Sequence, residues 1–232
     1  MKLSILVPCF NEEKFLEKCI DNIIQNSNLS IEKEIVVIDD CSTDKSKDIV
    51  LKLFDQKKID KHIIKNFNEG KGAAIRDGLK EVSGDIVLIQ DADLEYNPKD
   101  YNKLIDPIIH NDADVVYGSR YISTESKRVL LFWHGLANRI LTLLSNMVSN
   151  LYLSDMETGY KVFKTKLLKE IKIEENRFGF EPEITIKLAK KKLKFYEVGI
   201  SYNGRTYDQG KKIGLKDAFR AIYCIFKYFL KN

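Results

Sequence analysis

Short apolar runs alternate with amphipathic stretches over the first half of the chain. Strand-length apolar runs cover residues 3–7, 34–38, 86–89 and 113–117, with a weaker one at 62–65. A continuous apolar run of this length is typical of a strand that helices cover on both faces. The stretches between the runs carry apolar residues at helical spacing. The pattern therefore predicts an α/β fold with a mostly parallel, Rossmann-like sheet, right-handed crossovers and helices on both faces.

A long apolar stretch at residues 129–153 opens the second half. Polar residues, among them His134, Asn138 and Arg139, interrupt it. Since a membrane span needs roughly 20 uninterrupted apolar residues, this stretch predicts an amphipathic helix, which can touch lipid without crossing it. Further patterns predict a strand at 161–163, a helix from about 178 to 192 and a strand at 193–202.

The last predicted helix covers residues 215–230. Its apolar stripe comprises positions 215, 218, 219, 222, 226, 229 and 230, and lysines and arginines lie off this stripe. A helix of this kind packs on the rest of its domain by the apolar face, or it lies on a membrane surface. The pattern is compatible with both.

Composition narrows the class of protein. A chain of 232 residues with 44% hydrophobic content favours one domain, residues 1–232. Four cysteines without metal spacing indicate reduced thiols, and the strand-like start offers no signal peptide, so we expect a cytosolic protein. Residues 185–232 hold 12 lysines and arginines against three acidic residues. Such a basic region suits an anionic ligand, an anionic membrane surface or nucleic acid, or is simply a solvated face.

Carboxylates follow two of the predicted strands. Asp91, Asp93 and Glu95 come directly after the run at 86–89. Ligands bind at the carboxyl ends of parallel strands, and closely spaced oxygen ligands suit Mg²⁺ or Mn²⁺, so this segment predicts a metal-diphosphate site, with an acidic turn as the alternative. Asp39 and Asp40 end the run at 34–38, where they could bind a ribose or a base edge. Alternatively they belong to an N-cap cluster, in which Ser42 or Thr43 caps a helix running to about Phe54.

Candidate cations also lie at strand and helix ends. The sequence Gly70-Lys71-Gly72 at a helix entry offers amides and an ammonium to an anion, although it is not a Walker loop and could be a plain flexible turn. The glycine-rich dinucleotide fingerprint is missing, which argues against an NAD-binding domain. Arg120 follows the run at 113–117 and could bind phosphate bidentately or form a surface salt bridge.

Two later loops carry further candidates. Residues 203–213 contain Arg205 and Lys211, and this loop is a plausible lid over an anionic ligand. The polar segment 155–160 carries Asp155 and Glu157, either of which could serve as a general base or cap the next element.

Five motifs, taken together and in order, resemble family 2 glycosyltransferases of the dolichol-phosphate mannosyltransferase type. They are Val-Pro-Cys-Phe-Asn-Glu-Glu at 7–13, Val-Ile-Asp-Asp-Cys-Ser-Thr-Asp at 37–44, Asn-Glu-Gly-Lys-Gly-Ala-Ala-Ile-Arg-Asp-Gly at 68–78, Asp-Ala-Asp at 91–93 and Gly-Ser-Arg-Tyr at 118–121. The resemblance covers nearly the whole chain. It implies a GT-A fold, a nucleotide-sugar donor, Mg²⁺ or Mn²⁺, and an inverting transfer, with a donor half at 1–122 and an acceptor half at 123–232.

The resemblance also implies roles for individual positions. Pro8, Phe10 and Glu12 would surround the base, and Asp39 and Asp40 would bind the nucleoside. Lys71 and Arg76 would lie near the diphosphate. Asp91, Asp93 and Glu95 would face the metal. Arg120, Arg205 and Lys211 would hold an acceptor phosphate, and Asp155 matches the acceptor-side loop more loosely.

These observations lead to a ranked set of hypotheses. The first is transfer of a hexose from a donor of the GDP-mannose or UDP-glucose type to polyprenyl or dolichyl phosphate at the cytoplasmic membrane face, with Asp91, Asp93, Asp155 and Arg120 as the catalytic set and peripheral membrane attachment. The second is transfer to a hydroxyl, with Asp155 or Glu157 as base; replacing Asp155 would abolish this reaction and leave transfer to a phosphate largely intact. The third is a nucleotide-sugar-binding protein without turnover. Nucleic acid is not an expected partner, because the first half is acidic and the basic region lacks a stacking platform.

Overall fold

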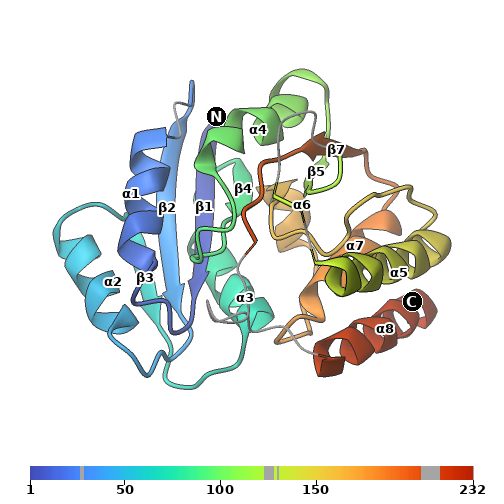
Figure 1. Cartoon of the computed structure of the whole chain (residues 1–232). Coiled ribbons are helices and arrows are strands. Elements are labelled where there is room, and N and C mark those ends of the chain that lie inside the picture. Colours follow the sequence, from blue (N-terminus) through green and yellow to red (C-terminus); the bar gives the residue numbers. More distant parts are fainter. Residues whose placement is uncertain (27–28, 123–127, 130, 205–214, 232) are drawn as a thin grey trace.

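A seven-stranded sheet forms the centre of the molecule (Figure 1). The computed structural model describes residues 1–26, 29–122, 128–129, 131–204 and 215–231. Its strands are β1 (Lys2–Cys9), β2 (Glu32–Asp39), β3 (Lys61–Ile64), β4 (Ile86–Ile89), β5 (Val115–Ser119), β6 (Lys161–Lys164) and β7 (Phe195–Gly199). They are ordered β3-β2-β1-β4-β6-β5-β7 across the sheet. The predicted strands are therefore all present, in an α/β arrangement.

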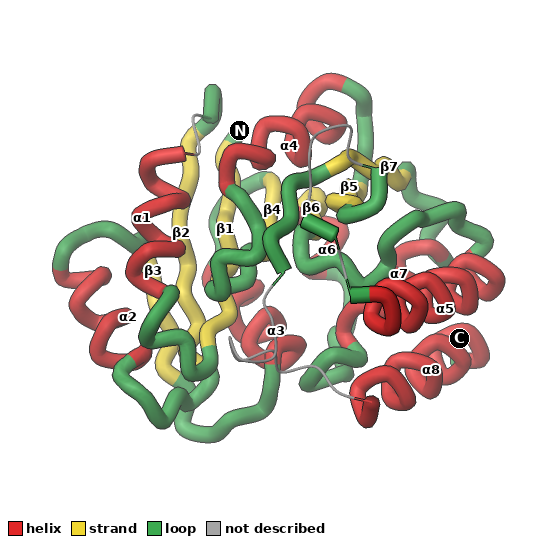
Figure 2. The backbone as a smooth tube through the Cα atoms, viewed as in Figure 1, coloured by secondary structure: helices red, strands yellow, loops and turns green. Residues whose placement is uncertain are grey.

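The sheet is parallel except at β6. This strand pairs antiparallel with β4 on one side and with β5 on the other. Because β6 is antiparallel to both of its neighbours, β5 runs in the same direction as β4, and therefore also as β1 and β2. The carboxyl ends of these four strands consequently share one edge, as predicted, and loops gather at the carboxyl ends of β1 and β2 (Figure 2). The interposed antiparallel strand was not predicted.

Helices cover both faces of the sheet. They are α1 (Leu16–Asn26), α2 (Ser46–Asp55), α3 (Lys71–Glu81), η1 (Pro98–Asp100), α4 (Tyr101–His110), α5 (Phe132–Ser149), α6 (Thr165–Lys169), α7 (Phe180–Ala189) and α8 (Leu215–Leu230). Side chains of α1, α2 and α4 belong to one buried apolar cluster, and those of α3, α7 and α8 to another. These two clusters lie on opposite faces because the side chains of a strand alternate between its faces.

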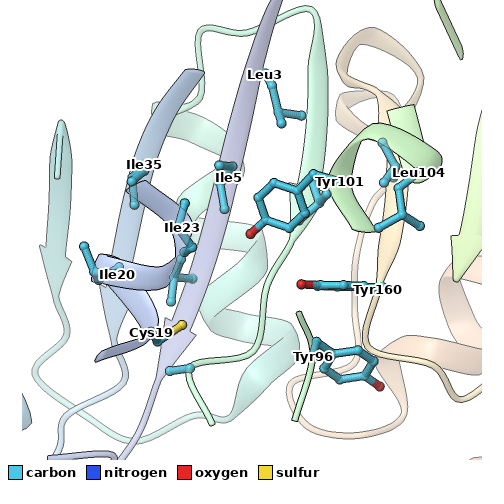
Figure 3. Close-up of a cluster of buried hydrophobic side chains, with 14 of the residues drawn as sticks. Leu3, Ile5, Cys19, Ile20, Ile23, Ile35, Tyr96, Tyr101, Leu104 and Tyr160 are labelled. Carbon is cyan, nitrogen blue, oxygen red and sulfur yellow. The ribbon is translucent and has the colours of Figure 1, made fainter. Parts of the chain in front are cut away.

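A group of buried tyrosines fixes the loop after β4 (Figure 3). The hydroxyls of Tyr101 and Tyr160 both donate to Gln90 Oε1, at 2.7 and 2.6 Å. Gln90 in turn donates from Nε2 to the carbonyl oxygen of Asp91, at 2.8 Å. The ring of Tyr96 lies 4.6 Å from that of Tyr160, and its hydroxyl accepts from the Gly159 amide at 2.6 Å. The acidic loop is thus anchored to the core on both sides of Asp91.

Some predicted boundaries are wrong. Neither Ser42 nor Thr43 caps α2, which begins at Ser46 and has Lys45 at its N-cap without a side-chain hydrogen bond. Ser42 Oγ accepts instead from the amide of Asn11, so the turn after β2 is held by the turn after β1. The short helix α6 was not predicted.

Candidate active site

A cavity of about 430 Å³ opens at the shared carboxyl edge of the strands. It collects residues from the turns after β1, β2, β4 and β5 and from the start of α3. Of the predicted site residues, Pro8, Phe10, Glu12, Asp40, Lys71, Asp91, Asp93, Glu95, Arg120 and Glu157 line it. Gly70, from the predicted anion-binding segment, also lines it. Further lining residues that were not assigned a role are Cys9, Asn68, Ala74, Ala92, Tyr96, Gly159, Arg177, Phe178, Glu181 and Tyr202. The convergence inferred from strand ends is therefore present.

The acidic loop meets a lysine at one wall of the cavity. Lys71 Nζ lies 2.8 Å from Asp91 Oδ1 and 3.1 Å from Glu181 Oε1. Burial alone would lower the pKa of Lys71, but the two carboxylates outweigh it and raise that pKa, so the ammonium stays charged. A cation already bridges Asp91 and Glu181 across the cavity wall.

The same loop offers oxygen ligands to a divalent cation. Asp93 Oδ1 accepts from the Glu95 amide at 3.1 Å, and Glu95 Oε2 accepts from the Tyr202 hydroxyl at 2.6 Å. Within the described residues no three acidic, histidine or cysteine side chains converge closely enough to hold a metal by themselves. Mg²⁺ is commonly bound by one or two carboxylates together with substrate phosphates. The carboxylate oxygens of this loop therefore fit a metal that is also bound by a diphosphate. The ion pair of Asp91 with the Lys71 ammonium shows that a positive charge is stable beside this carboxylate.

The two aspartates after β2 have different positions. Asp40 lines the cavity, and its carboxylate accepts from the amides of Glu69 and Gly70 while Lys65 Nζ lies 3.0 Å away. It therefore holds the loop that precedes Lys71. Asp39 is buried outside the cavity lining; its Oδ2 accepts from the Ser42 amide, and its Oδ1 accepts no hydrogen bond from the residues that the structure describes.

Arg76 lies away from the cavity, contrary to the prediction that it is near the diphosphate. Its Nη1 donates to the carbonyl of Ile173 and, at 2.9 Å, to Oδ1 of Asn176. The reason is helical phase: five residues beyond Lys71 on α3, the side chain points to a different side of the helix. Arg76 instead holds the segment that precedes α7.

Arg120, which lines the cavity, forms a buried bidentate pair with Asp155. Arg120 Nη2 and Nε lie 2.6 and 2.7 Å from the two Asp155 oxygens, and the Arg120 amide and Asn138 Nδ2 also donate to that carboxylate. Burial works to raise the pKa of Asp155, but Arg120 outweighs it and holds that pKa below its usual range. Asp155 is fully buried and does not line the cavity. Its geometry fits the orientation of Arg120 rather than proton abstraction from a substrate.

Two predicted residues, Arg205 and Lys211, lie outside the described residues, as does the predicted lid from residue 205 onward. In the other direction, Glu181 lines the cavity without having been predicted. It stands in the first turn of α7, and a carboxylate at that position of a helix is also a common capping residue, so the pattern alone did not separate the two roles.

A model of the family "Glycosyl transferase family 2" matches residues 4–172, which include most of β1 and all of β2 to β6. The chain belongs to glycosyl transferase family 2. The predicted resemblance is confirmed.

Two of the relatives have names that include dolichol phosphate or dolichyl phosphate. Dolichol-phosphate mannosyltransferase of Pyrococcus furiosus is 28% identical over 235 residues; the match covers 98% of this chain but only 64% of the relative. UDP-N-acetylglucosamine–dolichyl-phosphate N-acetylglucosaminyltransferase of Methanococcus voltae is 26% identical, with 95% of this chain and 93% of the relative covered.

The fold is shared with a solved structure of lower identity. Glucosyl-3-phosphoglycerate synthase from Mycobacterium tuberculosis, crystallised with Mn²⁺, UDP and phosphoglyceric acid, superposes with a TM-score of 0.75 at 18% identity. The match covers 99% of this chain and 78% of that one. The predicted GT-A fold is confirmed.

Gly159 of this family 2 chain leaves room for the acidic loop. A Cβ at this position would collide with Asp91 Oδ2 and lie 2.8 Å from the ring of Tyr96. We expect Gly159→Ala to displace the Asp91 carboxylate and lower turnover about a hundredfold, since a displacement of about 1 Å near the reacting groups can have this effect. Initial rates with nucleotide sugar and Mn²⁺ measure it. Gly135→Ala is the control, because a Cβ there meets nothing within 4 Å; a Gly159→Ala variant with the turnover of that control would contradict the expectation.

Glu157 gives the family 2 cleft a pH-dependent term in its stability. Burial, and then the charge of Glu181, raise the pKa of Glu157 from 4.5 to about 8. In the folded protein this group is thus protonated between pH 4.5 and about 8, whereas it is ionised in the unfolded chain. Its contribution to the free energy of unfolding therefore falls as pH rises through this window. We expect Glu157→Gln to gain roughly 1 to 3 kcal/mol relative to wild type from pH 5 to pH 8. Urea denaturation across this range measures the difference, and a constant difference would contradict it.

Proposed function

We propose that the protein is a divalent-metal-dependent, inverting hexosyltransferase that uses a nucleotide sugar, of the GDP-mannose or UDP-glucose type, and a polyprenyl phosphate acceptor. One observation carries the proposal. A single cavity is lined by the acidic loop, by Lys71, which pairs with Asp91, and by Arg120, which Asp155 fixes. This arrangement supports a diphosphate with its metal at the acidic loop and Lys71, and a second anionic group at Arg120. The names of the relatives support a lipid phosphate as that second group.

The chain's residues have defined tasks in this reaction. Pro8, Phe10 and Glu12 line the end of the cavity beside β1 and would bind the base. Asp91, Asp93 and Glu95 would hold Mg²⁺ or Mn²⁺, which, when bound, neutralises negative charge on the diphosphate. Lys71 adds a cation at the same place.

Arg120 would orient the acceptor phosphate for attack on the sugar from the face opposite the diphosphate. The acceptor is then already an anionic nucleophile, so the reaction requires no general base. Arg120 is preorganised for the task because its bidentate bond to Asp155 and its position over the ring of Tyr202, 5.2 Å from the centroid, fix the guanidinium.

The apolar surface of α5 supports a lipid environment for this acceptor. The buried residues of α5 include the polar Asn138, Thr142 and Ser145, whereas most of its exposed residues are large and apolar. The large apolar ones are Phe132, Trp133, Leu136, Ile140, Leu143 and Met147, and Ala137 and Arg139 are exposed beside them. The polar inner face contacts the Arg120–Asp155 pair directly, because Asn138 donates to Asp155. An outward apolar face adjoining a phosphate-binding wall fits a membrane that carries the acceptor.

Helix α8 extends the same surface. It packs beside α5 and exposes Phe219, Tyr223, Phe226, Phe229 and Leu230 (Figure 1). Its buried face is Ala221, Cys224, Ile225 and Tyr228 instead, so the predicted stripe is not the face by which the helix packs. No helix in the described ranges is long and apolar enough to cross a bilayer. Because of the exposed apolar side chains on both helices, we propose peripheral attachment through α5 and α8.

Vesicle co-sedimentation tests the attachment. The full chain is mixed with vesicles of phosphatidylcholine, with and without phosphatidylglycerol. We expect the wild type to bind the vesicles. The double variant Trp133→Ser, Met147→Ser should bind at least about fivefold more weakly, since each substitution removes apolar area that the bilayer would bury. Phe67→Ser is the control, because Phe67 is equally exposed far from α5 in the sequence and on no helix. Vesicle binding retained by the double variant would contradict a membrane partner. So would a wild-type dimer that the two substitutions convert to a monomer, because the apolar face would then be a dimer interface.

Turnover tests the reaction itself. Purified protein is incubated with GDP-mannose, UDP-glucose or UDP-N-acetylglucosamine, with and without Mn²⁺, and with a short polyprenyl phosphate or diacylglycerol. Metal-dependent product on polyprenyl phosphate supports the proposal and identifies the sugar. Product on diacylglycerol alone would favour a hydroxyl acceptor.

The hydroxyl reaction would need a base other than Asp155. Glu157 Oε1 and Glu181 Oε2 belong to acidic side chains that line the cavity, and both are buried oxygens that form no hydrogen bond with a described residue. They are the candidates for that alternative, which the diacylglycerol arm of the assay addresses.

A further inference from the structure

Arg177 differs from the other cations of the cavity. Lys71 is paired with Asp91 and Glu181, and Arg120 with Asp155. Arg177 lines the same cavity with an exposed side chain, and no described residue forms an ion pair or hydrogen bond with its guanidinium. Within the described part of the cavity it is the cation whose charge is not already matched by a carboxylate.

The stem of Arg177 lies on the loop that leads to Lys71. Gly70 has a φ of 104°, and a Cβ there would lie 2.7 Å from Arg177 Cγ and 2.6 Å from the carbonyl oxygen of Asn176. The two backbones thus approach each other as closely as a glycine permits. This contact puts Arg177 beside Gly70 and Lys71, which line the cavity with it.

The backbone around Arg177 is held in place although its side chain is exposed. The Ala73 amide donates to the Asn176 carbonyl at 3.1 Å, and Arg76 donates to the Asn176 side chain. On the other side, buried Glu175 accepts from Arg220 at 2.7 Å and from the Tyr228 hydroxyl at 2.9 Å. Arg76, which does not reach the cavity, therefore serves it indirectly by anchoring this segment.

We infer that Arg177 is a binding residue for the donor diphosphate; the inference rests on the proposed function. In the transfer, an acceptor phosphate oxygen forms a bond to the anomeric carbon, the bond from that carbon to the diphosphate oxygen breaks, and its electron pair remains on the diphosphate. Charge on the leaving group therefore increases, and Lys71 is already shared by two carboxylates. An unmatched guanidinium beside it stabilises the additional charge with charge-assisted hydrogen bonds.

Nucleotide binding tests this role without depending on turnover. Calorimetry with Mn²⁺ compares UDP with UMP and GDP with GMP on wild type, Arg177→Gln and Arg177→Lys. For the nucleoside that wild type binds, we expect Arg177→Gln to weaken the affinity for the nucleoside diphosphate about tenfold and the affinity for the monophosphate less than about twofold. The affinity of Arg177→Lys for the diphosphate should lie between those of wild type and Arg177→Gln. Lys172→Gln is the matched control, since Lys172 is an exposed cation of the same segment that faces a different hollow.

Each other outcome has a distinct meaning. Equal loss of both nucleotides, or no loss beyond that of Lys172→Gln, would overturn the assignment while leaving the proposed function intact. A raised KM for polyprenyl phosphate with unchanged UDP and GDP affinity would move Arg177 to the acceptor and overturn it too. Wild type that binds neither UDP nor GDP would overturn the proposed function and this inference together.

Discussion

Replacing Asp155 by asparagine is expected to lower transfer to polyprenyl phosphate by about two orders of magnitude, although Asp155 does not line the cavity. The carboxylate holds both arms of the Arg120 guanidinium that would position the acceptor. Loss of one partner of a buried pair also costs roughly 3 kcal/mol of folding free energy, because the remaining charge is left unmatched. Initial rates and thermal unfolding of the same preparation measure the two effects.

The design separates orientation from base catalysis. If Asp155 orients Arg120, the variant should lose acceptor kcat/KM while its affinity for UDP or GDP stays within about twofold of wild type. Asp114→Asn is the matched control, because Asp114 is a partly buried carboxylate that pairs with Lys164 at 2.8 Å outside the cavity. Rates on polyprenyl phosphate that match this control would contradict the orienting role and restore the expectation drawn from the sequence, in which only a hydroxyl acceptor needs Asp155.

The acidic loop shows why part of this site could be predicted. Asp91 follows a buried strand, and parallel strands bring their carboxyl ends to one edge whatever their order in the sheet. Convergence of Asp40, Asp91 and Arg120 therefore required only the strand assignments. The insertion of antiparallel β6 between β4 and β5 did not disturb it, since β5 keeps its direction.

Residues that reach the cavity from elsewhere could not be predicted in this way. Glu181, Arg177 and Tyr202 come from the region of α7 and from the segment after β7, and their positions depend on how those elements pack. Arg76 was misplaced for the opposite reason, because a shared motif says nothing about which side of α3 faces the cavity.

Helix α5 illustrates a limit of hydrophobic periodicity. The amphipathic pattern was detected, but periodicity does not specify what covers the apolar face. In the structure the polar side chains Asn138 and Thr142 point inward to Asp155 and to the Met156 amide, and the apolar side turns outward. The hydrogen bonds of Asn138 and Thr142 with residues 155 and 156 thus determine which face of the helix turns inward.

Asp91→Asn is expected to reduce turnover about a thousandfold, because it removes charge from a carboxylate that would hold the divalent metal in the proposed reaction. The substitution preserves shape, and Lys71 keeps its ion pair with Glu181, so the fold should persist. The measurement combines initial rates over a range of Mn²⁺ concentrations with Mn²⁺ binding by electron paramagnetic resonance in the presence of UDP or GDP.

The metal-binding measurement decides what Asp91 does. If Asp91 is a metal ligand, Asp91→Asn should weaken Mn²⁺ binding in the nucleotide complex. The Mn²⁺ concentration needed for the half-maximal rate should then be higher than in wild type. If Asp91 only holds Lys71 in place, Lys71→Met should produce the same rate defect with Mn²⁺ binding retained. Asp77→Asn is the control, since Asp77 is a carboxylate of α3 that pairs with Lys80 and Lys65 outside the cavity. Unchanged Mn²⁺ binding and a rate close to that control would remove Asp91 from the metal site, because a ligand carboxylate cannot lose its charge without loss of metal affinity.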